Sequence, residues 1–435
     1  MTVFRCGRLL LDGEFVDDGL LETAGDSISR AEPWPKGGPQ EFIDLQALAV
    51  IPAPVNGHLH SFQHLLRGVA DDLPFGGWRD ALYRYTTQLT ADDIELLALF
   101  AYSEAALRGT GTVCDFFYIH HGSNEYDLRL ARAAGDVGIR LVIARSMIDS
   151  EEAPEAYRES PSAARANFRE LRAELKGNPL VIAIPAPHSP HRASEVMFIA
   201  AAALAADFDC PWHTHLAEAK SETTTTRGRY GLTPLNWLNS LGVFGRRCCL
   251  VHGVWLAPDE VKLVAGAGAK LIHCPGSNQF LGDGIAPLGD YLARGVDVAL
   301  GTDSGSANNH ISMFLEMRQA ALLRRVATTD QSAFSAAVAF KMATCGGAAI
   351  TGLPVGELKP GMKADFVALN PNALSLLPNT SLLNNIVFSL EQEAIREVYV
   401  GGKAVVTGGR LAWRGAAELP ERIRELALRL GLGRS

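Results

Sequence analysis

Apolar runs of strand length alternate with helical periodicity through the middle of this 435-residue chain. In the helical stretches, apolar residues recur every three or four positions, which predicts helices with one buried face at 91–109, 126–138, 162–177 and 257–268. The runs between them are almost continuously apolar, as strands buried on both faces of a parallel sheet are. These runs predict eight strands, at 48–55, 111–119, 140–146, 180–187, 210–218, 248–254, 269–275 and 297–303.

Buried parallel strands that alternate with helices indicate an α/β fold, either a closed (β/α)8 barrel or an open doubly wound sheet. Eight strands fit the closed barrel. No strand is followed by a glycine-rich phosphate loop, which counts against the open sheet. Residues 1–50 and the C-terminal part of the chain differ from the middle, because their apolar runs are short and separated by Gly and Pro, as strands joined by turns are.

The composition narrows the class of protein. Apolar residues make up 47% and charged residues 20%, as in an ordinary globular enzyme, and the net charge of -8 comes without a basic run, so we expect no nucleic-acid partner. No apolar run reaches the length of a membrane span, and the N-terminus lacks the pattern of a signal peptide. The seven cysteines are scattered, which favours reduced thiols and a cytoplasmic location. We expect a small-molecule substrate and a homo-oligomer.

Polar residues stand at the C-terminal ends of several predicted strands, where barrel enzymes carry their chemistry. A single histidine in an apolar run is more often a core residue than a ligand. When histidines or acidic residues recur at the same end of several strands, however, one shared site is favoured. These strand-end residues are His58, His60, His188, His215, His252 and Asp303.

Imidazole and carboxylate groups are the ligands that suit a divalent transition metal. Two histidines separated by one residue on a strand point to the same side, so His58 and His60 supply two ligands from one strand. Such a metal lowers the pKa of a bound water and supplies a nucleophile at neutral pH. The pattern therefore predicts a metal-dependent hydrolase.

Four segments resemble the signature regions of the amidohydrolase superfamily, in its deaminase branch. They are VNGHLH at 55–60, HTHLAE at 213–218, LVHG at 250–253 and LGTDSGSANN at 300–309. The resemblance covers essentially the whole chain. It implies a TIM-like barrel over 51–355 and a small β-sandwich formed jointly by 1–50 and 356–435.

The same resemblance implies roles for individual residues. Glu218 matches the proton shuttle, and His252 matches the histidine that polarises the oxygen on the attacked carbon. His213 is interpreted as a strand residue beside the site. The stretch IAIPAPHSP at 182–190 has no lysine to bridge two metals, so we expect one divalent ion, Zn²⁺ or alternatively Fe²⁺. The metal ligands implied are His58, His60, His215 and Asp303, and Asp303 also takes the proton of the attacking water.

Some segments resemble methylthioadenosine and S-adenosylhomocysteine deaminases. These are LLRGVADDLP at 65–74, APHSP at 186–190 and GIAPL at 284–288. In that group, Arg145 and His188 match substrate contacts. Two departures concern the ribose: Thr87 replaces a glutamate that holds the diol, and EEAPEAYRE at 151–159 replaces a loop that carries a second arginine.

Other positions resemble formimidoylglutamate deiminase, whose substrate carries carboxylates. Gln63 in HLHSFQ, Arg79 in GWRDALYR and Tyr118 in FFYIHH match its substrate contacts, and arginine suits carboxylate recognition. The departure is HSPHR, which puts His191 where that family has a second arginine and puts Arg192 one residue later.

The leading hypothesis is a deaminase of an aminated ring, such as a purine, pterin or triazine, with a nucleoside included. The alternative is a deiminase of N-formimidoyl amino acids. A non-catalytic member of the superfamily is least favoured, because every expected metal ligand is present.

Overall fold

Eight parallel strands form the centre of the molecule in this computed structural model, which describes residues 1–432. Seven of these strands overlap the predicted apolar runs closely, but the first run, 48–55, falls mostly in a strand of the terminal sheet (Ile43–Pro52), and the barrel strand begins only at Val55. One sheet contains β5 (Val55–His60), β6 (Thr112–Phe117), β7 (Arg140–Met147) and β8 (Val181–Pro187), and the other contains β9 (Trp212–Leu216), β10 (Cys248–His252), β11 (Lys270–His273) and β12 (Val298–Leu300).

Two connections join these sheets into a TIM-like barrel. The chain leaves β12, which pairs with β11, and continues as β13 (Asp303–Ser304), which pairs with β5. At the other seam, the His215 N–H donates to the His188 carbonyl over 2.9 Å. Gly301 allows the connection between β12 and β13 to pass close to β5, because a Cβ at this position would lie 2.7 Å from the Cβ of His58. The predicted (β/α)8 architecture is confirmed.

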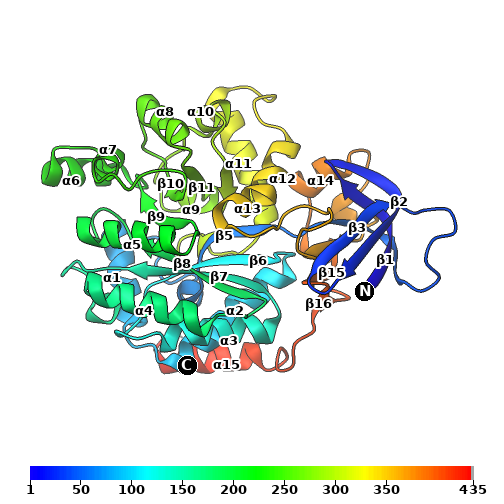
Figure 1. The fold of residues 1–435 in the computed structure, drawn as a ribbon, viewed down its shortest axis with the longest axis horizontal. Helices are drawn as coiled ribbons and strands as arrows, with labels where there is room; N and C mark the ends of the chain where they lie inside the picture. The colour runs from blue at the N-terminus through cyan, green and yellow to red at the C-terminus, as the bar shows by residue number, and fades with distance from the viewer. Residues whose placement is uncertain (433–435) are drawn as a thin grey trace.

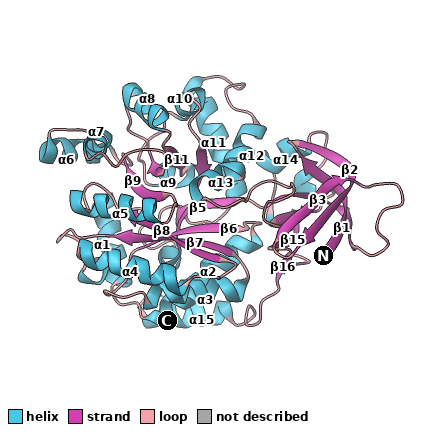
Figure 2. Cartoon of the chain, viewed as in Figure 1, coloured by secondary structure: helices cyan, strands magenta, loops and turns pink. Residues whose placement is uncertain are grey.

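Helices surround the strands (Figure 2). All four predicted helices are present, as α2 (Ala91–Leu107), α3 (Glu125–Val137), α4 (Pro161–Glu174) and α8 (Pro258–Ala267). Local signals set their ends: Thr90 and Asp93 form a capping box before α2, and α3 ends at Gly138 with a φ of 85°. Within the described residues, no helix is both long and apolar enough to cross a membrane.

The remaining helices of the barrel region were not singled out from the sequence. They are α1 (Phe75–Thr86), α5 (Glu195–Asp207), α6 (Lys220–Tyr230), α7 (Pro234–Ser240), α9 (Pro275–Phe280), α10 (Leu288–Ala293), α11 (Met313–Thr328), α12 (Ala336–Ala343) and α13 (Cys345–Thr351).

Both ends of the chain contribute to one further sheet, which lies beside the barrel (Figure 1). Its strand order is β17-β16-β15-β14-β4-β1-β2-β3. Phe4, Phe366 and Tyr399 pack in its core, with ring centroids 4.6–5.1 Å apart. The strands are β1 (Thr2–Leu11), β2 (Glu14–Ala24), β3 (Ser27–Pro33), β4 (Ile43–Pro52), β14 (Phe366–Leu369), β15 (Ile395–Val400), β16 (Lys403–Thr407) and β17 (Arg410–Leu411).

The last helix, α15 (Leu419–Arg429), does not stay with this sheet. It lies below the barrel beside α2 and α3 (Figure 1), and Arg429 forms an ion pair with Asp93 at the start of α2. Leu419 and Leu426 are buried, as the apolar face of an amphipathic helix should be. The segment after β17 therefore packs against the outside of the barrel and not in the terminal sheet.

Candidate metal centre and active site

Three histidines converge where β5 and β9 end. The Nε2 atoms of His58 and His215 are 3.2 Å apart, and His60 offers a nitrogen within 4.8 Å of both. Asp303 approaches from β13, with Oδ1 3.5 Å from His60 Nε2 and 3.7 Å from His58 Nε2. The structure thus brings together all four predicted metal ligands.

The protonation of these rings suits a metal. His60 Nδ1 lies 2.6 Å from the Phe116 carbonyl, and His215 Nδ1 lies 3.0 Å from the His188 carbonyl. Because a carbonyl only accepts, both Nδ1 atoms carry the proton and both Nε2 lone pairs face the centre. Burial and neighbouring charges hold the pKa of His58 and that of His215 well below the usual range, so these rings are neutral. The donor set fits a divalent ion such as Zn²⁺.

A second group of acid–base side chains lies against the first. Atoms of Glu218, His252 and Asp303 fall within 4.8 Å of one another, and Glu218 Oε1 is 3.6 Å from His252 Nε2. Burial, followed by the charges of Asp303 and Glu222, raises the pKa of Glu218 well above its usual range. Glu218 therefore holds a proton that it can donate, as the predicted shuttle requires.

The backbone at these strand ends takes an uncommon conformation. His252 has a φ of 74°, Asp303 a φ of 57°, and Ala217, directly before Glu218, a φ of 55°. Residues other than glycine rarely adopt positive φ values, and such positions concentrate at functional sites. Each of the three acid–base residues therefore either has a positive φ itself or directly follows a residue that has one.

A cavity of about 270 Å³ opens above these groups. Trp78 and Tyr83 of α1 contribute to its wall, and so does Tyr118, which follows β6. Gln63 donates to the Tyr118 hydroxyl over 2.6 Å and accepts from Ser306 over 3.0 Å. Gln63 and Tyr118 therefore line one pocket, as the sequence predicted.

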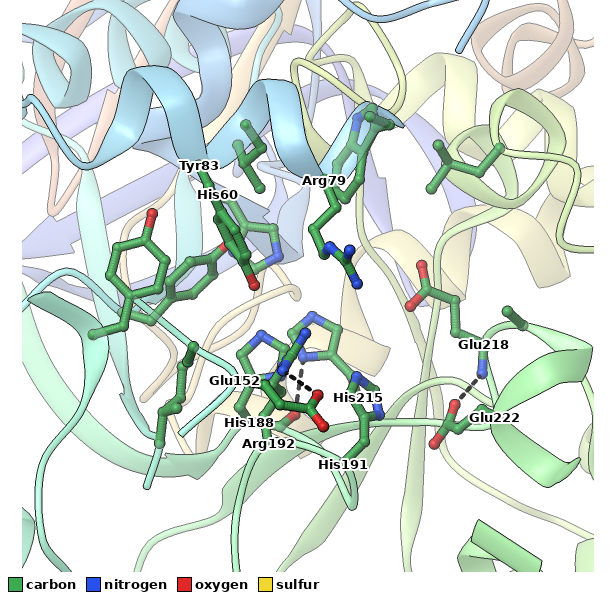
Figure 3. Close-up of a pocket in the computed structure, with 18 of the residues that line it drawn as sticks. His60, Arg79, Tyr83, Glu152, His188, His191, Arg192, His215, Glu218 and Glu222 are labelled. Carbon is green, nitrogen blue, oxygen red and sulfur yellow. Dashed lines mark hydrogen bonds and ion pairs between the residues drawn. The ribbon is translucent and has the colours of Figure 1, made fainter. Parts of the chain in front are cut away.

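Two arginines face this cavity from different sides (Figure 3). Arg79 projects from α1 toward the centre, and its nearest acidic partner is the adjacent Asp80, at 3.2 Å. Arg192 donates to Glu152 over 2.9 Å; its side chain is 9% exposed, whereas that of Glu152 is 79% exposed. Arg192 reaches the pocket even though it stands one residue later than the position expected for an arginine.

The two histidines near Arg192 are also in the wall. The ring of His188 stacks on that of His215 with centroids 4.8 Å apart, which places it beside the metal ligands as predicted. Burial, followed by the charge of Arg192, lowers the pKa of His191 to about 4, so this ring is neutral. His213 points away from the site, where its Nε2 bonds the Ile350 carbonyl at 2.8 Å, in agreement with its interpretation as a strand residue.

Arg145 corrects the sequence-based prediction. Its side chain is fully buried away from the cavity lining, and its guanidinium makes two hydrogen bonds to Glu159, at 2.7 and 2.9 Å, and one to Asn124, at 3.1 Å. With these donors occupied, Arg145 is not placed to contact a substrate. Thr87 is outside the lining too: it is exposed at the end of α1 and donates to the Tyr83 carbonyl.

Two residues of α9 complete the site without having been predicted. Ser277 donates to Asp303 Oδ2 over 2.6 Å, and Asn278 Nδ2 lies 3.1 Å from His252 Nδ1. They lie in α9, four and five residues after the end of β11, in HCPGSNQF. A search of the polar residues in the segments that follow the strands, and not only of His and acidic residues at the strand ends, would have found both.

Comparison with known proteins agrees with this arrangement. The amidohydrolase family model matches residues 49–405. A 5'-deoxyadenosine deaminase from Methanothermobacter thermautotrophicus is 34% identical over 414 residues, covering 94% of this chain and 92% of that protein. A 5-methylthioadenosine/S-adenosylhomocysteine deaminase from Pyrococcus furiosus is 31% identical over 417 residues, covering 94% and 95%.

Solved structures show the same fold. An adenosine deaminase from Xanthomonas campestris with bound zinc superposes with a TM-score of 0.92 at 26% identity, covering 99% of both chains. The atrazine chlorohydrolase of Arthrobacter aurescens, complexed with zinc, has a TM-score of 0.91 at 22% identity, covering 98% of this chain and all of that one, and supports the fold alone. From the family match and the length of the similarity, the chain belongs to the amidohydrolase family.

Proposed function

We propose that this chain is a metal-dependent hydrolase that releases ammonia from an aminated heterocycle, either a free ring of the purine, pterin or triazine kind or the same ring in a nucleoside. The observation that carries the proposal is the protonated Glu218 beside His252 and Asp303, directly above a set of ligands for one divalent ion. The names of the deaminase relatives support the same chemistry.

Each acid–base residue has a separate task. A divalent cation, when held by the three histidines and Asp303, acidifies a water and polarises the carbon to be attacked. Asp303 takes the proton that the water loses and passes it to the leaving amino group. Glu218 gives its proton to the ring nitrogen beside the reacting carbon and takes one back from the hydroxyl group as the carbonyl forms. His252 hydrogen bonds to the oxygen that becomes a carbonyl. The carbon–nitrogen bond then breaks, and ammonia leaves.

The cavity walls are suited to a flat substrate. Trp78, Tyr83, Tyr118 and Tyr157 supply aromatic surface around the opening. Aromatic side chains bind planar rings by stacking or by edge contacts. The volume of about 270 Å³ gives a ring room above Glu218.

The second candidate is a deiminase of N-formimidoyl amino acids. The observation that favours it is the pair of arginines, Arg79 and Arg192, in the wall of the same cavity as Gln63 and Tyr118. A guanidinium can hold a carboxylate through two parallel hydrogen bonds. Arg192 would have to exchange its bond with Glu152 for one with the substrate.

A panel assay separates the two candidates. The zinc-loaded protein is mixed separately with adenosine, 5'-deoxyadenosine, an amino-substituted pterin, an aminotriazine and N-formimidoylglutamate, and the release of ammonia is measured for each. Release from any aminated ring but not from the formimidoyl compound supports the proposal. Release from N-formimidoylglutamate alone overturns it in favour of the second candidate.

We extend the proposal to the setting of the enzyme. One Zn²⁺ per chain, with Fe²⁺ as the alternative, is supported by the cluster of three histidine ligands, the only such histidine cluster among the described residues, and by the absence of a lysine in 182–190. A cytoplasmic location is supported by seven free cysteines. A homo-oligomer is proposed as well, and light scattering tests it.

A further inference from the structure

The side chain of Asn278 connects His252 to a buried carboxylate. It is 1% exposed, and its Nδ2 lies 3.1 Å from His252 Nδ1 and 3.3 Å from Asp283 Oδ2. Asp283 is 8% exposed and follows α9. One amide nitrogen, which carries two hydrogens, therefore faces two acceptors.

This contact fixes where His252 carries its proton. An amide nitrogen donates and cannot accept, so His252 Nδ1 must be an acceptor and the ring proton must lie on Nε2. Asp283 in turn fixes the amide, because a flipped Asn278 would set its oxygen against a carboxylate oxygen. The two contacts are consistent only with the donating orientation of the amide.

The backbone holds this arrangement in place. The Asp283 N–H donates to the Asn278 carbonyl over 2.9 Å, and the Asn278 N–H donates to the Cys274 carbonyl over 3.0 Å. The indole N–H of Trp255 donates to the Asp283 carbonyl over 2.7 Å. Asn278 and Asp283 are thus fixed relative to β11, whose neighbour β10 carries His252.

We infer that Asn278 is a positioning residue that holds His252 in the Nε2–H tautomer, and that Asp283 maintains the amide orientation on which this depends. His252 Nε2 is buried and has no hydrogen-bond partner among the described protein atoms. It faces Glu218 at 3.6 Å across the site. The tautomer presents an N–H donor to the reacting oxygen, whereas the other tautomer would present a lone pair and repel it.

An exchange of the two side chains tests the inference. In the double variant Asn278→Asp/Asp283→Asn, the charge and size of the pair are kept, but the group facing His252 Nδ1 becomes an acceptor. We expect the proton of His252 to move to Nδ1. The zinc-loaded holoenzyme, labelled with ¹⁵N in its histidines, reports the tautomer by nuclear magnetic resonance, and His252→Asn identifies the signal.

The measurement is made at about pH 9, because burial and the neighbouring Glu218 raise the pKa of Asp283 to about 7. The wild-type enzyme should show the Nε2–H tautomer. The exchanged variant should show the Nδ1–H tautomer, with kcat reduced by about 10²–10³, as for the loss of one oxyanion donor, and with KM little changed. Gln279→Glu, an amide-to-carboxylate change at the next, exposed position of α9, is the matched control and should behave as wild type.

Asp283→Asn alone provides a second test should the exchanged variant not fold. An amide at position 283 can donate or accept, so His252 should populate both tautomers, with a smaller loss of kcat. An Nδ1–H signal in the wild-type enzyme, or an unchanged Nε2–H signal in every folded variant, overturns the inference. The kcat readout rests on the proposed function, but the tautomer readout needs no substrate, so a failure of the substrate panel is distinguishable from a failure of this inference.

Discussion

Replacing Arg145 by methionine should destabilise the fold and leave substrate affinity nearly unchanged. The substitution keeps the aliphatic stem but removes a guanidinium that makes two hydrogen bonds to Glu159, 2.7 and 2.9 Å long, and lies 3.7 Å from Asp127. Both carboxylates are at most 1% exposed, so neither can turn to water. Removing one partner of a buried ion pair costs about 3–5 kcal/mol, because the other charge stays buried.

Equilibrium unfolding in urea measures this loss. With a slope of about 2–3 kcal/mol per M, the midpoint should fall by roughly 1–2 M. The deficit should shrink as the pH is lowered toward about 5, because a buried carboxyl without its cation gains stability by taking up a proton. Arg145→Met/Glu159→Gln should recover part of the stability, since it removes the stranded charge.

The opposite result would restore Arg145 as a substrate contact. In that case KM would rise at least tenfold, while the unfolding free energy stayed within about 0.5 kcal/mol of wild type, the usual range for a surface change. The unfolding curve and the kinetic constants must therefore be measured on the same preparation of the variant.

Other variants test the remaining assignments. Glu218→Gln should retain zinc, as measured by metal analysis, yet lose about 10² or more in turnover; near-normal turnover would exclude Glu218 as the proton shuttle. His215→Ala should lose the bound zinc, whereas His213→Gln should keep one zinc per chain, because the His213 side chain points away from the site. Loss of zinc from His213→Gln would contradict this orientation. Burial lowers the pKa of His213 to about 4 from 6.5, so the wild type loses stability as the pH falls through this window, and His213→Gln should lose less in acid unfolding curves. Arg79→Met should weaken the binding of a formimidoyl amino acid by roughly 2–4 kcal/mol, the free energy of the lost charged hydrogen bonds, and so raise its KM strongly. The KM for a neutral ring should change little. An equal rise in KM for both substrates would show that Arg79 does not discriminate between them.

The barrel and the metal site were predictable because both depend on local patterns. Strands buried on two faces leave a continuous apolar run, and a parallel barrel places every strand end on one rim, so His58 and Asp303 could be assigned to one site although more than 240 residues separate them. The metal ligands needed no knowledge of loop structure. The protonated state of Glu218 did need the structure, because it results from burial.

The substrate pocket was less predictable because its walls are loops and long side chains. Arg145 stands at a strand end, like the ligands, but its direction depends on Glu159, which lies in a loop that sequence periodicity does not describe. Arg192 illustrates the converse. Its position one residue late argued against a pocket role, yet the turn after β8 carries its side chain into the wall. The position of an arginine in a sequence motif therefore does not determine which groups its guanidinium reaches.

The order of strands in the terminal sheet has a consequence for synthesis of the protein. Strand β4 lies between β1 and β14, and Ala49, Val50 and Ile51 of β4 are completely buried there. Its partner β14 leaves the ribosome only after the whole barrel has been made. Until then, one edge of β4 exposes unpaired backbone groups and apolar side chains, which is the kind of surface that pairs with other chains. Slower translation of the barrel segment should therefore lengthen the time for which the edge of β4 is exposed. Chaperones that bind the chain on the ribosome should increase the yield of folded enzyme more than chaperones that act after the chain is released.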